Sequence, residues 1–486
     1  MIDAMGSGTR IVAGLDSSSG WTSIVVCDAE TGEVLRHGHA EHPTTGQAPP
    51  ESWLLSLGEA AGGGVLEDVA AIGVAARQQA VVALDGARNP VRAALSEEQR
   101  MQGAAVDLID ALGGAAAWTG AVGAVPQIGH PVAQLAWLAR TEPELARRTA
   151  AVLQPQDWLV WQLLGRPERF TTDRGGASGT GYWSPAEERW RPDLLELALG
   201  RPAELPTVLG PAEAAGRTPE GLLISAGTGE TMAAALGLGL GSGDAVISLG
   251  ASASICAVHG AAVPDPDGMV TSYADATGLH LPVVRTLNAN RVLRGTADLL
   301  GRSPEELSAL ALTSTPGAHG LVLLPYLAGE RVPALPHTAG TLAGLRRESM
   351  RPEHLARAAF EGMLCGVADA AGVLRSRGVR IGRVFLLGPV AQLPAVRALA
   401  PGLLEAEVVV PEPADWAALG AARQAAWALA ASENSSSGAE PPAWPSPRGE
   451  TLRPDEEALA VGRAVRQQFT TVREERHPGA LGPAGD

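Results

Sequence analysis

Short apolar runs separated by polar turns open the chain and predict β-strands. Residues 10–16 form an apolar run that ends in Asp16, residues 22–27 form a second run, and a Ser-Ser-Ser-Gly turn lies between them. Short turns of Ser, Gly and Asp between such runs are typical of antiparallel hairpins. Residues 69–75 and 81–84 are further strand candidates. The amino-terminal part of the chain therefore predicts a sheet that begins with a hairpin.

Helical spacing of apolar residues replaces this pattern from about Gln102 to Leu164. The strand pattern restarts near Gly243, again as a hairpin that is followed by alternating helices and strands. The expected elements of this second half are strands at residues 245–249, 254–258, 383–387 and 408–410, and helices at residues 351–377, 395–404 and 416–430. Two units with this order of elements predict a duplicated α/β architecture with a cleft between two lobes.

The predicted domain boundaries follow changes in composition. We expect a flexible amino-terminal segment at residues 1–9, one lobe at residues 10–241 and a second lobe at residues 242–430. Residues 431–486 begin with a stretch rich in Ser, Pro and Gly, which is typical of a linker. A short amphipathic helix at residues 454–472 and a flexible tail complete this last segment.

Composition narrows the classes of function. The net charge of −16 disfavours nucleic acid and anionic membranes as partners, because both attract basic surfaces. No apolar run approaches the roughly 20 residues that span a bilayer, and residues 1–10 lack the apolar core of a signal peptide. The three cysteines lie far apart and form no metal or redox spacing. These features predict a cytoplasmic protein, and nothing in the sequence decides between a monomer and a homodimer.

Several motifs, taken in chain order, resemble those of the FGGY carbohydrate kinases, and the bacterial xylulokinases are the most similar branch. The motifs are Val12–Ser18, Asp173–Ser184, Gly227–Glu230, Ser248–Gly250 and Pro325–Arg331. Such motifs in the right order are a far more specific signal than any one of them alone. The resemblance covers roughly residues 11–429.

This resemblance implies an actin-like (ribonuclease H-like) ATPase fold in each lobe, with sugar and ATP meeting in the cleft. It also implies transfer of the γ-phosphoryl group of ATP, with Mg²⁺, to a hydroxyl of a ketopentose such as D-xylulose. The first lobe would hold the sugar and the first phosphate loop, and the second lobe the nucleotide. Such a reaction needs positioning, neutralisation of phosphate charge and a carboxylate that accepts the hydroxyl proton. Because the chain contains no lysine, mechanisms that need a lysine Schiff base or a P-loop lysine are excluded.

The hairpin turn after Asp16 matches the first phosphate loop of the family. Backbone N–H groups of a tight turn can bind phosphate, and the hydroxyls of Ser17, Ser18 and Thr22 can add donors. Asp16 can hold Mg²⁺ directly or through water, because hard cations prefer carboxylate oxygen. An ordinary Asp-Ser hairpin without a ligand is the alternative.

Glu230 stands where the resemblance implies an aspartate that acts as the catalytic base. It keeps the carboxylate and a similar intrinsic pKa, but its side chain is longer by one methylene group. A displacement of about 1 Å can cost on the order of 10²-fold in rate. The alternative is that Glu230 is an acid near the start of a helix at residues 231–240, which it stabilises through the helix dipole. Both interpretations stay open at this point.

The sugar-binding surface departs from the family pattern. Gln78 and Gln79 stand where the family has Gln-His, Glu98 lies where it has Trp-Asn-Asp, and Gly176 replaces an aspartate. A missing hydrogen-bond partner is costly in a polar site. We therefore expect weaker binding of D-xylulose, with Gln78, Gln79 and Glu98 as the candidate contacts to this sugar or to another polyol.

Two loops of the second lobe match the nucleotide-binding segments of the family. Gly250 and Ser252 remain in the second phosphate loop, although alanines replace a threonine and a glycine beside them. Gly388 remains at the start of the adenosine loop, but Pro389 removes a donor and Val390 adds a branched side chain. We expect Gly250, Ser252 and Gly388 to contact the nucleotide, and we expect ATP to bind more weakly than in the family pattern.

Two functions are compatible with this sequence. One is an ATP-dependent sugar kinase, slowed by its substituted loops; the other is a catalytically inactive paralogue that binds a sugar, a nucleotide or a partner protein and regulates it. The strands and helices follow the family while the departures gather in loops, so the chain specifies a folded protein in either case. His37, His39 and His42 form a small cluster without acidic ligands at metal spacing, and we expect them to be surface histidines.

Overall fold

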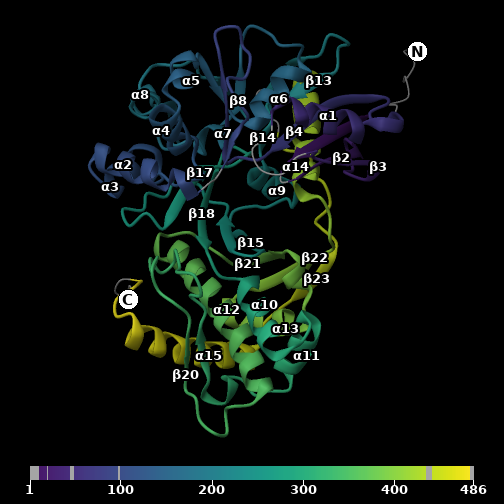
Figure 1. Cartoon of the computed structure of the whole chain (residues 1–486). Coiled ribbons are helices and arrows are strands. Elements are labelled where there is room, and N and C mark those ends of the chain that lie inside the picture. The colour runs from purple at the N-terminus through teal and green to yellow at the C-terminus, as the bar shows by residue number, and fades with distance from the viewer. Residues whose placement is uncertain (1–9, 19, 44–48, 97–98, 434–439, 482–486) are drawn as a thin grey trace, which may run out of the picture. The chain divides into compact units, whose positions relative to one another are not determined.

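The computed structural model describes residues 10–18, 20–43, 49–96, 99–433 and 440–481, which form two compact units. Unit 1 comprises the chain up to Leu240 together with Ser272–Leu281 and Ala414–Ser446. Unit 2 comprises Gly241–Thr271, Pro282–Pro413 and the chain from Pro447 onward. Figure 1 labels the elements of both units.

The units differ from the predicted lobes, residues 10–241 and 242–430, in two segments. Ser272–Leu281 and the segment that contains helix α14 (Trp416–Glu433) belong to unit 1, although both follow residue 241. Helix α14 belongs there because it packs directly on the sheet of unit 1, which its local sequence does not reveal. The predicted flexible segments at residues 1–9 and 482–486 lie outside the described residues, and the division into lobes as independent domains stays a prediction.

The sheet of unit 1 has seven strands in the order β12-β13-β4-β1-β2-β3, and β14 pairs with β4 beside this path. The strands are β1 (Ile11–Ser17), β2 (Trp21–Asp28), β3 (Val34–Glu41), β4 (Val69–Ala76), β12 (Ala214–Arg217), β13 (Leu223–Ser225) and β14 (Thr228–Gly229). The predicted hairpin is confirmed, since β1 and β2 pair antiparallel, while β4 runs parallel to β1 on its other side. Asp16 lies opposite Ser23 of β2 and Ala75 of β4, so the end of β1 is flanked on both sides.

Side chains of β1 alternate between two layers of helices, as a pleated strand requires. Leu15 belongs to an apolar core that includes Trp158 of helix α6 (Pro155–Leu163), whereas Val12 belongs to the core on the α14 side. Gly14 also faces α14, and a Cβ atom there would lie 1.8 Å from the carbonyl oxygen of Ala418. Glycine is therefore needed for this close approach, which brings the start of α14 to the end of β1.

A helical region and a three-stranded sheet complete unit 1. The sheet has the order β6-β5-β7, with β5 at Ala80–Leu84, β6 at Leu95–Ser96 and β7 at Ala151–Leu153. The helices around it are α2 (Gln102–Leu112), α3 (Ala115–Val122), α4 (Pro131–Thr141), α5 (Pro143–Arg148) and α8 (Pro192–Leu199). Strand β7 interrupts the stretch that the sequence predicted as helical, because a three-residue apolar run fits either element until it pairs with β5.

Unit 2 holds the core of a second seven-stranded sheet, in the order β17-β18-β16-β15-β21-β22-β23. The strands are β15 (Asp244–Leu249), β16 (Ala253–Ala257), β17 (Val270–Ala274), β18 (His280–Thr286), β21 (Arg383–Leu387), β22 (Glu407–Pro411) and β23 (Gly449–Leu452). The predicted second hairpin is confirmed, since β15 and β16 pair antiparallel and β21 runs parallel to β15. The sheet thus repeats the local order of β2, β1 and β4 in unit 1.

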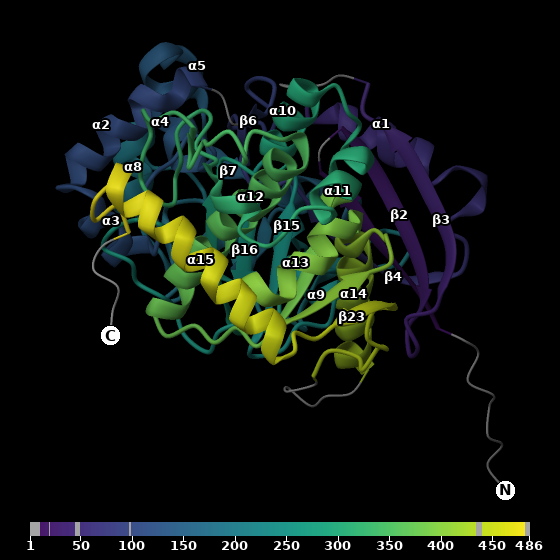
Figure 2. The same ribbon diagram turned by 90° about the horizontal axis from the view of Figure 1, so that it is seen from below.

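The helices of unit 2 are α10 (Asn290–Leu300), α11 (Pro304–Leu312), α12 (Pro352–Ser376), α13 (Pro394–Leu404) and α15 (Glu456–Arg476). Helix α12 is buried along most of its 25 residues. Helix α15, longer than the predicted helix at residues 454–472, lies across α12 and α13 in Figure 2. A Cβ atom on Gly462 would lie 2.1 Å from the carbonyl oxygen of Gly402, so the α15 and α13 backbones touch there.

No helix in the described part of the chain combines the length and the apolarity needed to cross a membrane.

Candidate active site

Three carboxylates gather at the end of β1 in unit 1. Asp16 lies at this end and is buried, with 6% of its surface exposed. Strand β14 pairs with β4 at Ala75, the residue that also lies opposite Asp16, and Glu230 follows β14 directly. Asp415 directly precedes helix α14, which packs on the sheet of unit 1. The sheet topology therefore brings Glu230 and Asp415 to the carboxylate of Asp16.

The charge of this cluster is visible in the pKa of Asp16. This pKa is raised to about 8, mainly by burial; a hydrogen bond donated by Ser18 opposes the rise, and the nearby carboxylates of Asp415 and Glu230 add to it. A buried carboxylate surrounded by other carboxylates disfavours its charged form. The site therefore has an excess of negative charge that a cation would relieve.

Asp415 also belongs to this cluster, although no sequence motif singled it out. Its carboxylate accepts a hydrogen bond from the Ser23 hydroxyl and caps helix α14, because Oδ1 accepts from the backbone N–H of Ala418 at 3.0 Å. An aspartate just before a helix is common, because it caps the first backbone N–H groups, so its position in the sequence does not indicate a role in a site. Only the contact of α14 with β1 and β2 brings it to the site.

Glu230 is the first residue of helix α9 (Glu230–Gly237) and is half-buried. This position is the one that the helix-dipole interpretation requires, and it is also within electrostatic reach of Asp16. The structure thus brings Glu230 to the site without deciding between a base and a helix-stabilising acid. The helix ends earlier than the predicted residue 240.

A buried aspartate holds the segment before Glu230. Asp173 accepts a hydrogen bond from the Thr228 hydroxyl at 2.6 Å and from the backbone N–H groups of Gly175 and Gly176. Burial raises the pKa of Asp173 to about 6, and these hydrogen bonds oppose the rise. Thr228 lies two residues before Glu230, so Asp173 fixes the backbone from which the Glu230 side chain extends.

The predicted phosphate hydroxyls lie together at the hairpin turn. The Ser17 and Thr22 hydroxyls hydrogen-bond to each other at 3.1 Å, and both lie within hydrogen-bond distance of His42 Nε2, at 3.3 and 3.1 Å. Ser18 is bonded to Asp16 instead. Ser17, Ser18 and Thr22 are therefore brought next to Asp16, as the sequence predicted for one loop.

The expectation of a surface histidine needs correction for His42. Its backbone N–H donates to Gly20 at 2.7 Å, which places the ring over the turn rather than outside the sheet. Burial lowers the pKa of His42, and the nearby guanidinium of Arg77 lowers it further, so the ring is neutral near pH 7. The signal that could have found it is the hairpin register, which pairs Trp21 with Glu41 and so carries the next residue past the end of β3.

Arg77 supplies a positive charge beside these hydroxyls. It follows β4 directly and is close enough to lower the pKa of His42. In a chain without lysine, phosphate charge must be met by arginine, a metal ion or backbone N–H groups. Arg77 is thus a second residue that the sequence did not single out.

The predicted sugar-binding glutamines take different places. Gln78 is buried beneath Gly229, and its Nε2 donates to the carbonyl oxygen of Gly175 at 3.0 Å, while its Oε1 has no partner among the residues that the structure describes. Gln79 is half-buried, and its side chain lies against Gly129. Glu98, the third predicted contact, lies outside the described residues.

The space beside Gly176 is filled by polar side chains. A Cβ atom on Gly176 would lie 2.4 Å from Nε2 of Gln156 and 2.8 Å from Oε1 of Gln154. These two side chains also bond to each other at 2.7 Å. The Asp173 carboxylate lies equally close to this Cβ position, at 2.8 Å, so the volume beside Gly176 is a buried polar layer of two amides and one carboxyl group.

The residues of unit 2 that were predicted to bind the nucleotide lie at the carboxyl ends of the neighbouring strands β15 and β21. Gly250 and Ser252 are exposed in the turn between β15 and β16, and Gly388 follows β21, the parallel neighbour of β15. Gly388 has φ +97°, and a Cβ atom there would lie 2.6 Å from the carbonyl oxygen of Leu249. The structure therefore brings these three residues together.

The expected obstruction by Val390 needs correction. The Val390 side chain is 3% exposed and belongs to the core of unit 2, because residues 389–392 form a 3₁₀ turn that directs it inward. Pro389 is the exposed member of this turn. A branched side chain therefore does not project from the loop, and the missing N–H of Pro389 is the departure that remains.

Comparison with known proteins places these features in a family. Residues 11–239 match the N-terminal domain of the FGGY family of carbohydrate kinases, and residues 224–429 match the C-terminal domain of the same family. The chain is similar to xylulose kinases of Streptomyces coelicolor, with 38% identity over 437 residues, and of Streptomyces rubiginosus, with 38% over 435 residues. Each alignment covers 86% of this chain and 88% of the relative.

A solved structure supports the same relation. The fold is similar to that of xylulose kinase from Bifidobacterium adolescentis, with a TM-score of 0.88 and 35% sequence identity over 96% of this chain and 99% of the other. The predicted α/β fold of this kinase family is thereby confirmed.

Proposed function

The chain belongs to the FGGY family of carbohydrate kinases, and on that premise we propose that it transfers the γ-phosphoryl group of ATP to a ketopentose hydroxyl, with D-xylulose as the first candidate. Kinases of this family use ATP as a substrate. The relatives described above are xylulose kinases, which supports the sugar class. The observation that carries the proposal is the approach of Glu230 to Asp16 at the end of β1.

Glu230 acts as the proton acceptor in this proposal. It takes the proton of the sugar hydroxyl while the hydroxyl oxygen bonds to the γ-phosphorus, and the bond from that phosphorus to the bridging oxygen breaks, so ADP leaves with the electron pair. Asp173 and Thr228 are positioning residues, because they fix the backbone before Glu230. The extra methylene group of glutamate makes this step slower than an aspartate in the same place would.

Asp16 is the residue that would hold Mg²⁺. The excess negative charge around this buried carboxylate fits a cation, since ionisation of Asp16 is disfavoured without one. Among the described residues, the carboxylates of Asp16, Glu230 and Asp415 do not form a group that could hold a metal ion by itself, so Mg²⁺ would also need oxygens of the ATP phosphates and of water. When bound, Mg²⁺ would neutralise phosphate charge.

The hydroxyl turn and Arg77 would receive the phosphate chain of ATP. Ser17 and Thr22 are already oriented by their bonds to each other and to the neutral ring of His42, which reduces the entropy lost on binding. Arg77 adds the positive charge beside them. In unit 2, Gly250, Ser252 and Gly388 would contact the nucleotide mainly through backbone groups.

The sugar surface favours a neutral polyol. The half-buried amide of Gln79 can hydrogen-bond to hydroxyl groups, whereas Gln78, Gln154 and Gln156 are at most 2% exposed and form the polar layer behind it. Such a surface binds hydroxyl groups, while its departures from the family pattern shift the preference among ketopentoses and polyols. Reduced activity towards D-xylulose is therefore part of the proposal.

An ADP-release screen tests this function. Purified protein with millimolar Mg-ATP is incubated with D-xylulose, other ketopentoses and pentitols, beside a sample without sugar. The proposal expects sugar-dependent ADP release above the sample without sugar, together with heat of Mg-ATP binding in calorimetry. Absence of both contradicts it; Mg-ATP binding without ADP release from any sugar would support the inactive, regulatory paralogue instead.

A further inference from the structure

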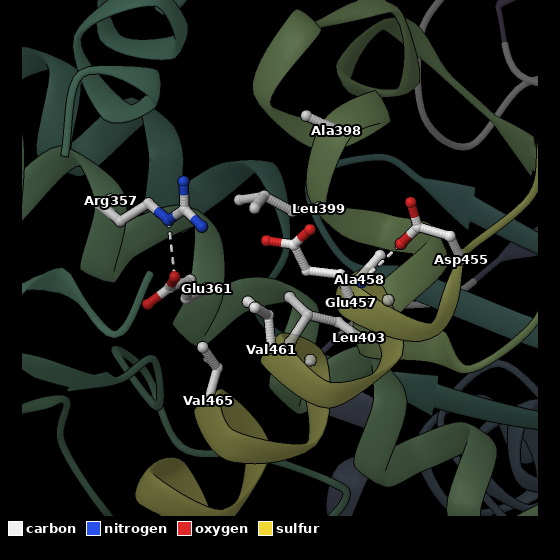
Figure 3. Close-up of a pocket in the computed structure, with 12 residues that line it drawn as sticks. Arg357, Glu361, Ala398, Leu399, Leu403, Asp455, Glu457, Ala458, Val461 and Val465 are labelled. Atoms are coloured by element: carbon white, nitrogen blue, oxygen red, sulfur yellow. Dashed lines mark hydrogen bonds and ion pairs between the residues drawn. The ribbon is translucent and has the colours of Figure 1, made fainter. Parts of the chain in front are cut away.

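A separate pocket lies within unit 2, between helices α12, α13 and α15. Its volume is about 330 Å³, which is in the range of small-molecule sites. Figure 3 shows Arg357 and Glu361 of α12 on one side and the first turns of α15 on the other. None of the lining residues belongs to the candidate active site.

Arg357 is the feature that marks this pocket as built for a ligand. Its side chain is 7% exposed, and its Nε donates to Glu361 Oε1 at 2.6 Å. Its two terminal nitrogens have no hydrogen-bond partner among the described residues, and in Figure 3 one of them is directed towards the side of Leu399 and Glu457 while the other points away from Glu361. A guanidinium edge that is open to the pocket can donate two hydrogen bonds to an oxyanion.

A negative charge faces Arg357 across the pocket. Figure 3 shows the Glu457 carboxylate pointing towards the guanidinium from α15, and Glu457 forms no ion pair within the described part of the chain. Asp455, the other acid of this wall, is occupied as the cap of α15 because it accepts from the Ala458 N–H at 2.7 Å. The pocket thus presents a guanidinium that is paired with Glu361 on one edge only, and an unpaired carboxylate on the opposite wall.

The remaining wall is apolar. Leu399 and Leu403 of α13 and Val461 and Val465 of α15 line it, and Gly402 and Gly462 let the two helices approach closely below it. A ligand that satisfies the whole pocket therefore needs an anionic group, a cationic group and a short hydrocarbon body. A simple organic anion would leave the Glu457 carboxylate opposed to its own charge.

We propose that this pocket binds a free α-amino acid with an apolar side chain. Its carboxylate pairs with the open edge of Arg357, its ammonium group pairs with Glu457, and its side chain packs against Leu399, Leu403 and Val461. The site is separate from the proposed sugar and nucleotide sites, so an amino acid would be a third class of ligand for the protein.

The bound amino acid connects α15 to the body of unit 2. Arg357 lies on α12 and Glu457 lies on α15, so the ligand joins two elements that are far apart in sequence. A ligand that binds only the folded arrangement stabilises it by mass action. Amide hydrogen exchange in α15 should therefore slow on binding.

Calorimetry of the full-length protein with L-leucine tests the charge pairing. We expect saturable binding at a single site, whereas 4-methylpentanoate and isoamylamine, which carry only one of the two charges, bind at least about tenfold more weakly. Equal binding of isoamylamine would overturn the role of Arg357, and equal binding of 4-methylpentanoate would overturn that of Glu457. No saturable heat with leucine, valine or phenylalanine would overturn the proposal.

Two exposed positions give variants that keep the fold. Ala398→Trp fills the mouth of the pocket and should abolish leucine binding, while Ala398→Ser should not. Glu457→Gln should weaken binding about tenfold, and Glu456→Gln, on the same turn but outside the pocket, should leave it unchanged. Leucine binding that survives Ala398→Trp would place the ligand elsewhere and contradict the proposal. Replacement of Arg357 is a poorer test, since it leaves Glu361 buried and unpaired.

Discussion

The two hairpins β1–β2 and β15–β16 share a topology and differ in chemistry. Each lies beside a parallel strand, β4 in unit 1 and β21 in unit 2. The first hairpin carries Asp16 and a turn of hydroxyl groups, and it gathers Glu230 and Asp415 around it. The second carries Gly250, Ala251 and Ser252, with no acid in the turn. The same local fold thus carries buried carboxylates in one unit and an uncharged turn in the other.

The shared topology brings loops together at the ends of the strands in both units, but the residues in each loop determine its chemistry. In unit 1, buried carboxylates disfavour their own ionisation, which is a cost that a purely structural hairpin would avoid. In unit 2, the close contact of Gly388 with Leu249 depends on the absence of a side chain. The first loop is under electrostatic constraint and the second under steric constraint.

Asp16→Asn should cause the largest loss of activity, because it removes the acid that distinguishes the first hairpin from the second. Removing the carboxylate that would hold Mg²⁺ should lower kcat by about 10²–10³-fold, as loss of a principal electrostatic contact does. The same change removes a buried carboxyl with a raised pKa, so thermal stability should be unchanged or higher. Steady-state ADP release and a thermal melt measure both. Full activity in the variant would show that Asp16 has no role in catalysis.

Asp173→Asn should remove a pH dependence that belongs to unit 1. The folded pKa of about 6 is above the unfolded value of 3.8, so the stabilisation relative to the unfolded state is full below pH 3.8 and is lost as pH rises through 6. Relative to the variant, the wild type should lose up to about 3 kcal/mol over this window. Urea unfolding at pH 4, 5, 6 and 7 measures it.

The matched control for this prediction is Asp298→Asn, which replaces an exposed aspartate on α10 in unit 2. Its stability should follow the wild type across the same pH range. An Asp173→Asn protein that also follows the wild type at every pH would contradict the assigned cause.

Gly388→Ala should disturb unit 2 by sterics alone. Alanine at φ +97° is strained, and its Cβ atom would meet the Leu249 carbonyl oxygen, so the loss of stability should be about 1–3 kcal/mol. Gly378→Ala is the control, because that glycine has φ +84° but open space around it. Urea unfolding compares the two. An equal loss in both variants would show that the contact with Leu249 contributes nothing.

Ser17→Ala and Ser252→Ala should have the smallest effects on activity, and these effects should differ between the two loops. The Ser17 hydroxyl is oriented by Thr22 and His42, and its loss should lower kcat/KM for ATP by up to about tenfold, the equivalent of one hydrogen bond. Ser252 is exposed in its turn, so its loss should change this value by no more than about twofold. Steady-state kinetics at varied ATP concentration measures both values. A larger loss in Ser252→Ala than in Ser17→Ala would contradict the proposal that the hydroxyls of the first loop bind the phosphates.

The parts of the fold that the sequence predicts are those with local signals. The hairpins at β1–β2 and β15–β16 have polar turns between apolar runs, and the long apolar stripe of α12 predicts it to within one residue at each end. Strand β7 has only three apolar residues inside a helical stretch, so its identity depends on pairing with β5. Helix α14 can pack on the sheet of unit 1 because Gly14 and Gly73 have no side chain that would collide with its backbone. The sequence alone does not show which helix these two glycines face.

The candidate site divides in the same way. Asp16, Ser17, Thr22 and Glu230 lie in contiguous motifs, so a resemblance could select them. Asp415 and Arg77 come from other segments and reach the site through sheet register and helix packing, which no local pattern encodes. Val390 was expected in the loop surface but lies in the core, because the 3₁₀ turn after Gly388 rotates it inward.

The central claim is that Glu230 accepts the proton of the sugar hydroxyl, and single-turnover phosphoryl transfer from γ-labelled ATP tests it most directly. The best sugar of the screen is compared in the wild type, Glu230→Gln and Glu230→Asp. The account predicts a loss of about 10²–10⁴-fold in Glu230→Gln and a faster rate than wild type in Glu230→Asp, because aspartate is one methylene shorter. A transfer rate in Glu230→Gln equal to that of the wild type would contradict the account and leave Glu230 as a helix-stabilising acid.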